Sequence, residues 1–326
     1  MNQKSWISVA VLAVAFAACD APPSAPPVTL RIGVYATQDF LPYFVMQEQG
    51  FDKKNGVKFE ESPLAGGAAA IDAMAAGAID MCPGVGIVPL LAAAERGVIP
   101  DKVVPVAAND FADPEHRGGA VIVARSVNSW KDLEGKKISA NARNSIGGAA
   151  MEARLKQEGV RAWSFVEIPF SNQGLAVAGG NLAAASMNEP YLTQSLLRGD
   201  GKLLDWVIGG SPLERTAFTS IVFSSDFRRR NPEGVKAFLR AHLAAVRWIN
   251  DHPDEARIVL ARRLNLTADV ARKINLLRWP LDARTDPGLL DQTQQVLLRA
   301  DLMQRPVDTR ALHDEMLLAE VLKETR

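Results

Sequence analysis

The sequence contains few of the residue types and motifs that usually carry catalysis. It has two cysteines and four histidines in 326 residues, and the histidines are scattered without the spacing of a metal site. No serine-hydrolase elbow, phosphate-binding Gly-Lys-Ser/Thr loop or His-Glu-x-x-His motif occurs. A dinucleotide fingerprint starting at Gly84 fails because Pro89 occupies its third glycine position. These absences favour a binding protein over an enzyme and predict neither a metal nor a cofactor.

Excess charge of either sign is also missing. Lys and Arg together number 37, as do Asp and Glu, so the formal net charge is zero. This balance argues against nucleic acid or an acidic surface as the partner. An apolar run from Ile7 to Ala18 follows Lys4 and is too short to span a bilayer. We therefore expect residues 1–18 to be an export signal.

The residues around Cys19 predict that a lipid anchors the exported protein to a membrane. Phe16-Ala17-Ala18-Cys19 resembles a bacterial lipobox, a small-residue site before a cysteine that becomes lipid-modified. The proline-rich residues 19–29 are then expected to be a tether. Asp20 resembles an inner-membrane retention signal, which favours that membrane if the host is Gram-negative. Cleavage after Ala17, which would leave a free periplasmic protein, stays open. Cys82 then has no disulfide partner and is expected to be a small buried hydrophobe.

The stretch from Ser62 to Pro89 shows the local pattern on which the fold prediction depends. Gly66 and Gly67 open an alanine-rich segment that predicts a helix, and a further glycine fits its C-cap. The apolar residues 78–82 predict a buried parallel strand, followed by a loop at residues 83–86. Such loops, at the carboxyl ends of parallel strands, are where open α/β sheets bind ligands.

A similar order of elements recurs farther along the chain. We expect a strand at residues 163–168, a helix from Asn172, a strand at residues 182–187 and a loop at residues 188–191. The repetition predicts two α/β lobes around a shared cleft. About 300 mature residues also exceed what one core usually serves.

The expected lobes are discontinuous in sequence. We expect residues 30–108 and 219–326 to form the first lobe and residues 109–218 the second, with nearly all residues after Asn231 in helices. The crossings, at residues 108–126 and 214–223, are then expected to act as a hinge.

Candidate ligand contacts follow from position at strand ends and helix starts. Small or hydroxyl residues at a helix N-terminus leave backbone N–H groups for a polar or anionic ligand. The alternative that Asn188 merely caps a helix and Glu189 offsets the helix dipole at the rim, without any ligand, stays open. Arg143 is the basic residue near these loops. The predicted contacts are Thr37, Gln38, Gly66, Gly67, Pro83, Gly84, Asn109, Ser145, Gly147, Asn188, Glu189 and Tyr191.

Several short strings, taken together, resemble solute-binding proteins of ABC importers, in the nitrate, sulfonate and taurine group that also includes thiamine-pyrimidine-precursor binders. The likeness covers nearly the whole mature chain. The strings are Leu30-Arg31-Ile32-Gly33, Ala75-Ala76-Gly77-Ala78-Ile79-Asp80, Trp130-Lys131-Asp132-Leu133-Glu134-Gly135-Lys136-Lys137-Ile138, Asn188-Glu189-Pro190-Tyr191, Asn231-Pro232-Glu233 and Asp251-His252-Pro253-Asp254-Glu255-Ala256.

This resemblance implies an α/β, two-lobed periplasmic-binding-protein fold of type II, with a hinge of two crossing strands and a helical C-terminal segment. It also implies a periplasmic monomer that binds a small organic solute, such as a sulfonate or carboxylate, and delivers it to an ABC permease and ATPase complex. The family commonly has Trp-Asp-Pro-Phe where this chain has Asn188-Glu189-Pro190-Tyr191. The identity of the ligand therefore does not transfer.

Two other functions stay open. A ligand-sensing module would present its closed lobes to a receptor and would lack a cognate importer. An enzyme resembling pyrimidine synthases, which use pyridoxal phosphate and sacrifice a histidine, would need a His and a Lys in the cleft. No such pair stands in the predicted cleft loops, so we expect a protein that is not an enzyme.

Overall fold

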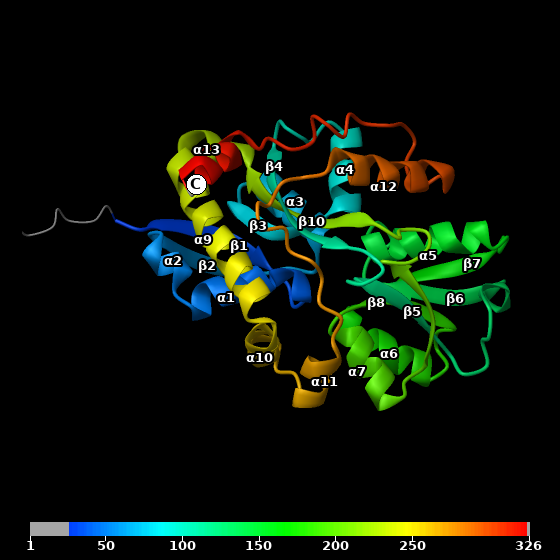
Figure 1. The fold of residues 1–326 in the computed structure, drawn as a ribbon. Coiled ribbons are helices and arrows are strands. Elements are labelled where there is room, and N and C mark those ends of the chain that lie inside the picture. The colour runs from blue at the N-terminus through cyan, green and yellow to red at the C-terminus, as the bar shows by residue number, and fades with distance from the viewer. Residues whose placement is uncertain (1–25, 325–326) are drawn as a thin grey trace, which may run out of the picture.

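Two five-stranded mixed sheets carry the fold. The computed structural model describes residues 26–324, and the export signal, Cys19 and most of the predicted tether lie outside that range. Figure 1 shows the two sheets side by side, each flanked by helices. Sheet A has the order β2 (Val57–Pro63), β1 (Val28–Val34), β3 (Met81–Gly86), β10 (Thr216–Ser224), β4 (Val103–Ala112), and sheet B the order β7 (Trp163–Glu167), β6 (Lys136–Ala140), β8 (Ala184–Asn188), β5 (Gly119–Val123), β9 (Lys202–Ile208).

Helices connect and cover these strands. Those before the second crossing are η1 (Gln38–Phe40), α1 (Leu41–Glu48), α2 (Phe51–Lys54), α3 (Gly67–Ala75), α4 (Ile87–Glu95), η2 (Trp130–Leu133), α5 (Ile146–Gln157), α6 (Phe170–Ala178) and α7 (Tyr191–Arg198). Those after it are α8 (Ser225–Arg230), α9 (Pro232–Asp251), α10 (Pro253–Leu264), α11 (Ala268–Lys273), α12 (Pro287–Arg299) and α13 (Met316–Glu324).

The two sheets share one topology, which confirms the repetition expected from the sequence. In sheet A, β1 pairs in parallel with β2 and β3, and β10 runs antiparallel to both β3 and β4. In sheet B, β6 pairs in parallel with β7 and β8, and β5 runs antiparallel to both β8 and β9. The carboxyl ends of the parallel strands therefore supply equivalent loops from each sheet.

Local capping rules account for several helix ends. The Ser145 hydroxyl accepts a hydrogen bond from the Gly148 N–H at 3.1 Å at the start of α5. The Asn231 side chain accepts one from the Gly234 N–H at 3.0 Å before Pro232 begins α9. Gly77 ends α3 with a φ of +73°, a left-handed conformation that glycine adopts without a Cβ clash. These boundaries follow from short-range chemistry, which is why the sequence predicts them.

Strand β3 differs from the prediction. A strand was expected at residues 78–82 with a loop at 83–86, but β3 runs from Met81 to Gly86. The long strand β10 supplies antiparallel partners up to Gly86, and the register shifts between Ser220 and Val222, where Pro83 and Gly84 have no partner. A proline is tolerated in a strand at such an irregularity because it cannot donate to the ladder.

Other differences lie at the ends of elements. Strand β1 begins at Val28, inside the predicted tether, and β4 extends to Ala112, past the predicted end of the first lobe. Nearly all residues after Asn231 were expected in helices, but residues 274–286 and 300–315 are not helical, so α13 starts only at Met316. The expected range 108–126 contains the first connection between the sheets, after β4 and before β5. The second connection, residues 209–215 between β9 and β10, overlaps the expected range 214–223 only at residues 214 and 215.

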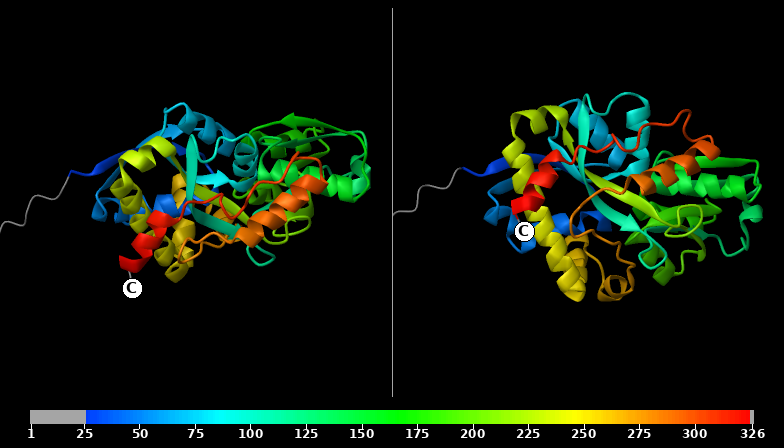
Figure 2. Two further views of the ribbon diagram at one scale, coloured as in Figure 1. Left: turned by 90° about the horizontal axis from the view of Figure 1, so that it is seen from above. Right: turned by 45° about the horizontal axis from the view of Figure 1, so that its top comes forward.

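The C-terminal helices contact both halves of the molecule. Helices α9 and α13 pack beside sheet A, whereas α12 lies across the top, next to both β10 and α5. Helix α11 contacts α7 of the second half. The views in Figure 2 show the same bridging position of α12. The C-terminal helices therefore cover the first half and also contact the second.

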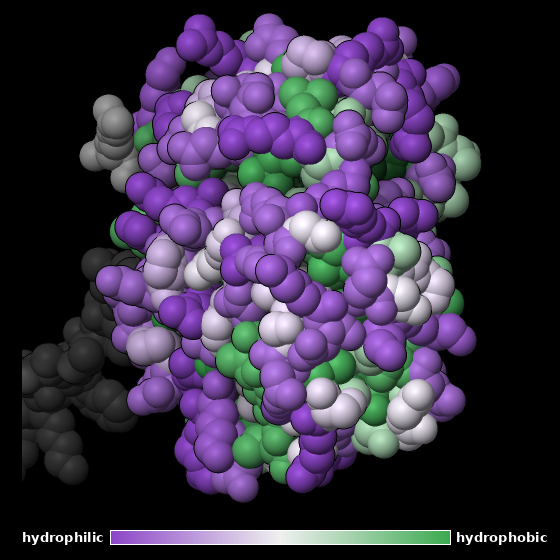
Figure 3. Space-filling model, turned by 90° about the vertical axis from the view of Figure 1, so that its right-hand side faces the viewer, coloured by the Kyte–Doolittle hydropathy of each residue, from purple (hydrophilic) through white to green (hydrophobic). Residues whose placement is uncertain are grey.

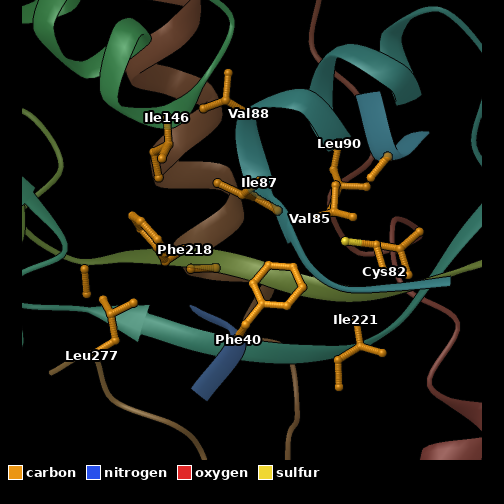
Figure 4. Packing of buried hydrophobic residues seen from close by; sticks show 14 of the residues in the cluster. Phe40, Cys82, Val85, Ile87, Val88, Leu90, Ile146, Phe218, Ile221 and Leu277 are labelled. Atoms are coloured by element: carbon orange, nitrogen blue, oxygen red, sulfur yellow. The ribbon is translucent and has the colours of Figure 1, made fainter. Parts of the chain in front are cut away.

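The apolar core continues from one half into the other. Figure 4 shows Ile146, at the start of α5, pointing toward Ile87 and Val88 of α4, with Phe218 of β10 on the same side. All four side chains are at most 6% exposed and belong to one buried cluster. The structure thus presents the two sheets in a closed arrangement. Cys82 is buried in this cluster, as predicted, and forms no disulfide within residues 26–324.

The surface is mostly polar. On the side of sheet B, Figure 3 shows hydrophilic residues with separate small apolar patches. Among residues 26–324, we find no helix with the length and apolar character needed to cross a bilayer.

Candidate ligand-binding cleft

A small cavity lies where the two sheets meet, and we call it the inner cavity. Its volume is about 40 Å³. It receives residues from the ends of β1 and β8, from β10 and from the starts of several helices, and so from both halves of the molecule. Its lining is Tyr35, Thr37, Asp39, Gly66, Gly67, Gly86, Pro89, Asn141, Ser145, Ile146, Phe170, Asn188, Phe218 and Thr219.

A larger cavity of about 400 Å³, the outer cavity, shares part of this lining. Gly66, Gly67, Pro89, Asn141 and Ser145 belong to both cavities. The other lining residues of the outer cavity are Ala65, Ala68, Ala69, Ala142, Arg143, Asn144 and Glu167. The two cavities are therefore adjacent parts of one cleft between the two halves, the smaller of which we call inner because it receives residues from both sheets.

Three helix N-termini meet where the cavities join. Helix α3 follows Gly66, α4 follows Gly86 and α5 follows Ser145. The first turn of a helix has backbone N–H groups without intrahelical partners and the positive end of the helix dipole. This part of the cleft therefore favours a polar or anionic group. Gly67 also allows α3 to approach closely, because a Cβ there would lie 3.0 Å from the Gly86 nitrogen.

The inner end of the cleft has the opposite charge preference. Asp39 lines the inner cavity and is 4% exposed; burial raises its pKa to about 7. Its Oδ2 accepts a hydrogen bond from the Thr37 hydroxyl at 3.2 Å, and its Oδ1 has no partner. Behind it, Asp110 is fully buried, and burial together with repulsion from Asp39 raises the pKa of Asp110 well above its usual range.

The structure brings five of the predicted contacts to the inner cavity. Thr37, Gly66 and Gly67 come from the first half, and Ser145 and Asn188 from the second. They follow the positional rule on which the prediction depended, since each stands at a strand end or a helix start. Contact with a ligand stays a prediction for all five.

The side chains of Gln38 and Glu189 accept hydrogen bonds from other parts of the protein. The Gln38 side-chain oxygen accepts a hydrogen bond from the Leu277 N–H at 3.3 Å. The fully buried Glu189 carboxylate accepts hydrogen bonds from the Thr193 N–H at 3.1 Å, the Thr193 hydroxyl at 2.8 Å and the Asn275 N–H at 3.3 Å. Glu189 therefore binds the first turn of α7 from a buried position, not from the rim of the cleft, and its carboxylate does not line either cavity.

The remaining predicted contacts lie outside the linings of both cavities. The Asn109 amide donates hydrogen bonds to the Asp39 carbonyl and the Thr219 hydroxyl, both at 2.9 Å. Pro83 and Gly84 lie within β3, where the Gly84 carbonyl accepts a hydrogen bond from the Tyr35 hydroxyl. Gly147 packs on Ser186, whose hydroxyl oxygen would lie 2.8 Å from a Cβ at that position.

Tyr191 stands behind an aromatic residue that does line the cleft. Its ring stacks on that of Phe170, with centroids 5.6 Å apart and an interplanar angle of 11°. Tyr191 thus positions Phe170 and is outside the lining of both cavities.

Sequence reasoning missed several lining residues. Asp39 lies in the same turn as Thr37, and Asn141 directly follows β6, so the strand-end rule could have found both. Phe218 and Thr219 lie inside the antiparallel strand β10, where no local signal marks a ligand site. Tyr35, Gly86, Pro89, Ile146 and Phe170 complete the set.

Arg143 is the basic residue of the outer cavity, and its charge is already paired. Its guanidinium donates to the Glu152 carboxylate at 2.7 and 2.9 Å, and the Glu152 side chain is 1% exposed. Its backbone N–H also donates to Glu167 at 2.7 Å. The charge of the exposed Arg143 side chain is therefore already paired with the buried Glu152 and is not free for a ligand.

Solved structures show the same fold at low sequence identity. The ligand-binding component of an ABC-type import system from Staphylococcus aureus has a TM-score of 0.75 at 14% identity, covering 90% of this chain and 98% of that one. The periplasmic aliphatic sulphonate binding protein SsuA from Escherichia coli has a TM-score of 0.66 at 20% identity, covering 90% and 100%. The desulfurization enzyme DSZB has a TM-score of 0.65 at 18% identity, covering 91% and 99%.

These likenesses establish a periplasmic-binding-protein fold with two lobes, as the sequence predicted. None of the curated proteins matches this sequence. Residues 23–265 match the NMT1-like family, which agrees with the resemblance seen in the sequence. Because that match spans most of the chain and the fold agrees with it, the protein belongs to the NMT1-like family.

Proposed function

We propose that this protein is the extracytoplasmic solute-binding component of an ABC importer. In this role it captures one small organic solute between its lobes, as a monomer, and delivers it to a membrane permease and ATPase complex. The supporting observation is the inner cavity, to which both halves contribute strand-end and helix-start residues. Such convergence is typical of ligand sites in open α/β sheets. The units built on sheets A and B are then the two lobes that close over the solute.

A sulfonate or carboxylate is one ligand class that fits the sequence, and an uncharged or aromatic solute is equally open. The N-termini of α3, α4 and α5 support an anionic group where the two cavities join. Arg143 adds little to this preference because Glu152 already pairs with it.

An enzyme is the second candidate, favoured by the likeness to DSZB. Cysteine, histidine and lysine are missing from the described linings of both cavities, although hydroxyl and carboxyl groups such as Ser145 and Asp39 are present. Cys82 is buried outside these linings, and burial raises the pKa of its thiol to about 12, which disfavours the reactive thiolate. We therefore propose binding without catalysis.

Ligand screening tests the proposed function. A solute that binds only the folded protein raises its melting temperature by mass action. We expect at least one compound among sulfonates, carboxylates, amines, pyrimidines and aromatic acids to do so, and the loaded protein to stimulate the ATPase of its cognate permease. A protein that binds the solute but does not stimulate the ATPase, and instead binds a receptor domain, would support the sensor alternative.

We also propose that lipid on Cys19 anchors the mature protein to the membrane. The small residues before Cys19 and the proline-rich stretch after it support this step. Mass spectrometry of the mature N-terminus should find a diacylated cysteine. An unmodified N-terminus at Ala18 would contradict the anchor and indicate a free periplasmic protein.

A further inference from the structure

Two carboxylates lie next to each other at the inner end of the cleft. Asp110 is held by the Thr219 N–H at 2.9 Å, the Thr219 hydroxyl at 2.6 Å and the Asn109 amide at 3.3 Å. The Asp39 carboxylate accepts a hydrogen bond from the Thr37 hydroxyl and is also stabilised by its own backbone N–H, but its Oδ1 remains without a partner although the residue is 4% exposed. A buried oxygen without a hydrogen-bond partner lowers the stability of the folded protein unless another group supplies the missing hydrogen bond.

No positive charge faces this pair among the described residues. The titratable groups that interact with Asp39 are Tyr35 at the end of β1, Cys82 on β3 and Asp110 on β4. Each of them gains a negative charge when it loses its proton, so none can neutralise a carboxylate. Strand β10 contributes Thr219, which is uncharged. The nearest candidate in the outer cavity, Arg143, is paired with Glu152.

We propose that the solute places a positively charged nitrogen group, such as a protonated amine or an amidinium, against Asp39 in the inner cavity. This inference deepens the proposed solute-binding function and depends on it. A buried carboxylate without a partner is unfavourable, whereas one paired with a cation and hydrogen-bonded is tolerated. The ligand would thus supply the charge that the protein lacks.

The shape of the cleft fits such a group. At about 40 Å³ the inner cavity holds only a small head group, and the outer cavity of about 400 Å³ accommodates the rest of the molecule. The rings of Tyr35, Phe170 and Phe218 line the inner cavity. Aromatic faces attract cations, which adds to the attraction of Asp39. Any anionic part of the same molecule would lie at the helix N-termini where the cavities join.

Binding of a cation should depend on pH with a definite sign. Burial raises the pKa of Asp39 to about 7 in the free protein. Below that pH the carboxyl is protonated and has no charge to offer, so affinity for a cationic solute falls by about 10-fold per pH unit. An anionic solute, which needs the neutral carboxyl, would show the opposite trend.

A matched compound screen tests this proposal. The probes are equal numbers of primary amines and amidines, sulfonates and carboxylates, and neutral alcohols, matched in size and applied at millimolar concentration to the purified protein. Thermal shift identifies binders, and calorimetry then measures affinity at about pH 6 and about pH 8, on either side of the pKa of Asp39. We expect an amine or amidine to bind, more tightly at the higher pH.

Two variants sharpen the result. Asp39→Asn keeps the shape of the side chain and removes its charge, and should weaken binding of that compound by at least about 10-fold while abolishing its pH dependence. Asp52→Asn is the control, because Asp52 on α2 is also a buried aspartate with an unpartnered oxygen but lies outside the cleft. It should leave affinity unchanged.

The contrary outcomes are distinct. Sulfonates, carboxylates or alcohols as the only binders, or an amine that Asp39→Asn binds as well as the wild type, would overturn the cation proposal and leave the proposed function standing. Stabilisation by none of the compounds would contradict both. The pH dependence of the wild-type protein gives a result even if a variant fails to fold.

Discussion

Asp39 shows how one buried side chain couples the cleft to the stability of the whole protein. Its pKa is raised to about 7 by burial, so the folded protein keeps this proton between about pH 4 and about pH 7 whereas the unfolded chain releases it. Stability therefore falls as the pH rises through this window and stays low above it. The loss is roughly 1.4 kcal/mol for each unit by which the pKa is raised.

We expect Asp39→Asn to stabilise the ligand-free protein at about pH 8 by a few kcal/mol, and by much less at about pH 5, where Asp39 is already neutral in the fold. Urea denaturation of wild type and variant at both pH values measures this difference. An equal difference in the free energy of unfolding between variant and wild type at both pH values would show that the pKa of Asp39 is not raised. The result does not require a known ligand.

At the scale of one element, two neighbouring residues in the turn before α7 have different roles. Asn188 lines the inner cavity at the end of β8, whereas Glu189 is directed into the protein and bonds Thr193 and Asn275. Burial raises the pKa of Glu189, which its hydrogen bonds only partly oppose. One residue of this turn is thus available to a ligand and the next is structural.

Substitutions in this turn should separate the two roles. Glu189→Ala is expected to lower the free energy of unfolding by about 1 to 3 kcal/mol and to leave ligand affinity unchanged, because Thr193 and Asn275 lose a buried acceptor. Asn188→Ala is expected to weaken binding by roughly 5- to 150-fold. Urea denaturation and calorimetry provide the two measurements. Unchanged affinity in Asn188→Ala would remove it from the site.

The segment between α11 and α12 is a second element with a double role. The Asn275 N–H donates to Glu189 of the second half, and two residues later the Leu277 N–H donates to Gln38 of the first. An isolated bridge between Phe111 and Arg278 holds the same segment to the end of β4. This segment therefore links both halves beside the connections that are expected to form the hinge.

At the scale of the whole molecule, the two halves are in direct apolar contact, and the proposed function requires them to separate to admit a solute. The inner cavity is small, and Ile146 of α5 is buried against α4 and Phe218. Opening would expose this apolar contact, and a bound solute would offset that cost by adding its own contacts. Hinge closure of this kind is common in two-lobed binding proteins.

Small-angle scattering should therefore give a larger radius of gyration for the ligand-free protein than for the protein saturated with a binder from the screen. Ile146→Ser, which weakens the apolar contact between α4 and α5, should shift the ligand-free protein farther toward the open form and reduce affinity. Identical scattering curves with and without ligand would indicate a rigid scaffold. The radius of the saturated wild-type protein serves as the reference for both.

Short-range patterns were sufficient to predict much of this protein. Helix caps at Ser145, Asn231 and Gly77 depend on neighbouring residues, and the repeated order of strands and helices predicted two lobes with equivalent loops. Thr37, Gly66 and Asn188 reach the inner cavity because the strand-end rule applies within a single βα unit. The family strings added the connectivity of the lobes.

Tertiary structure alone decided the rest, because the relevant partners lie far apart in the sequence. Glu189 and Gln38 look like ligand contacts until the chain returns with Asn275 and Leu277 to occupy them. The end of β3 depends on β10, which follows more than a hundred residues later. The raised pKa of Asp39 likewise cannot be predicted from neighbouring residues, because its surroundings include Gly84 of β3, Asn109 of β4 and Thr219 of β10, which lie far away in the sequence.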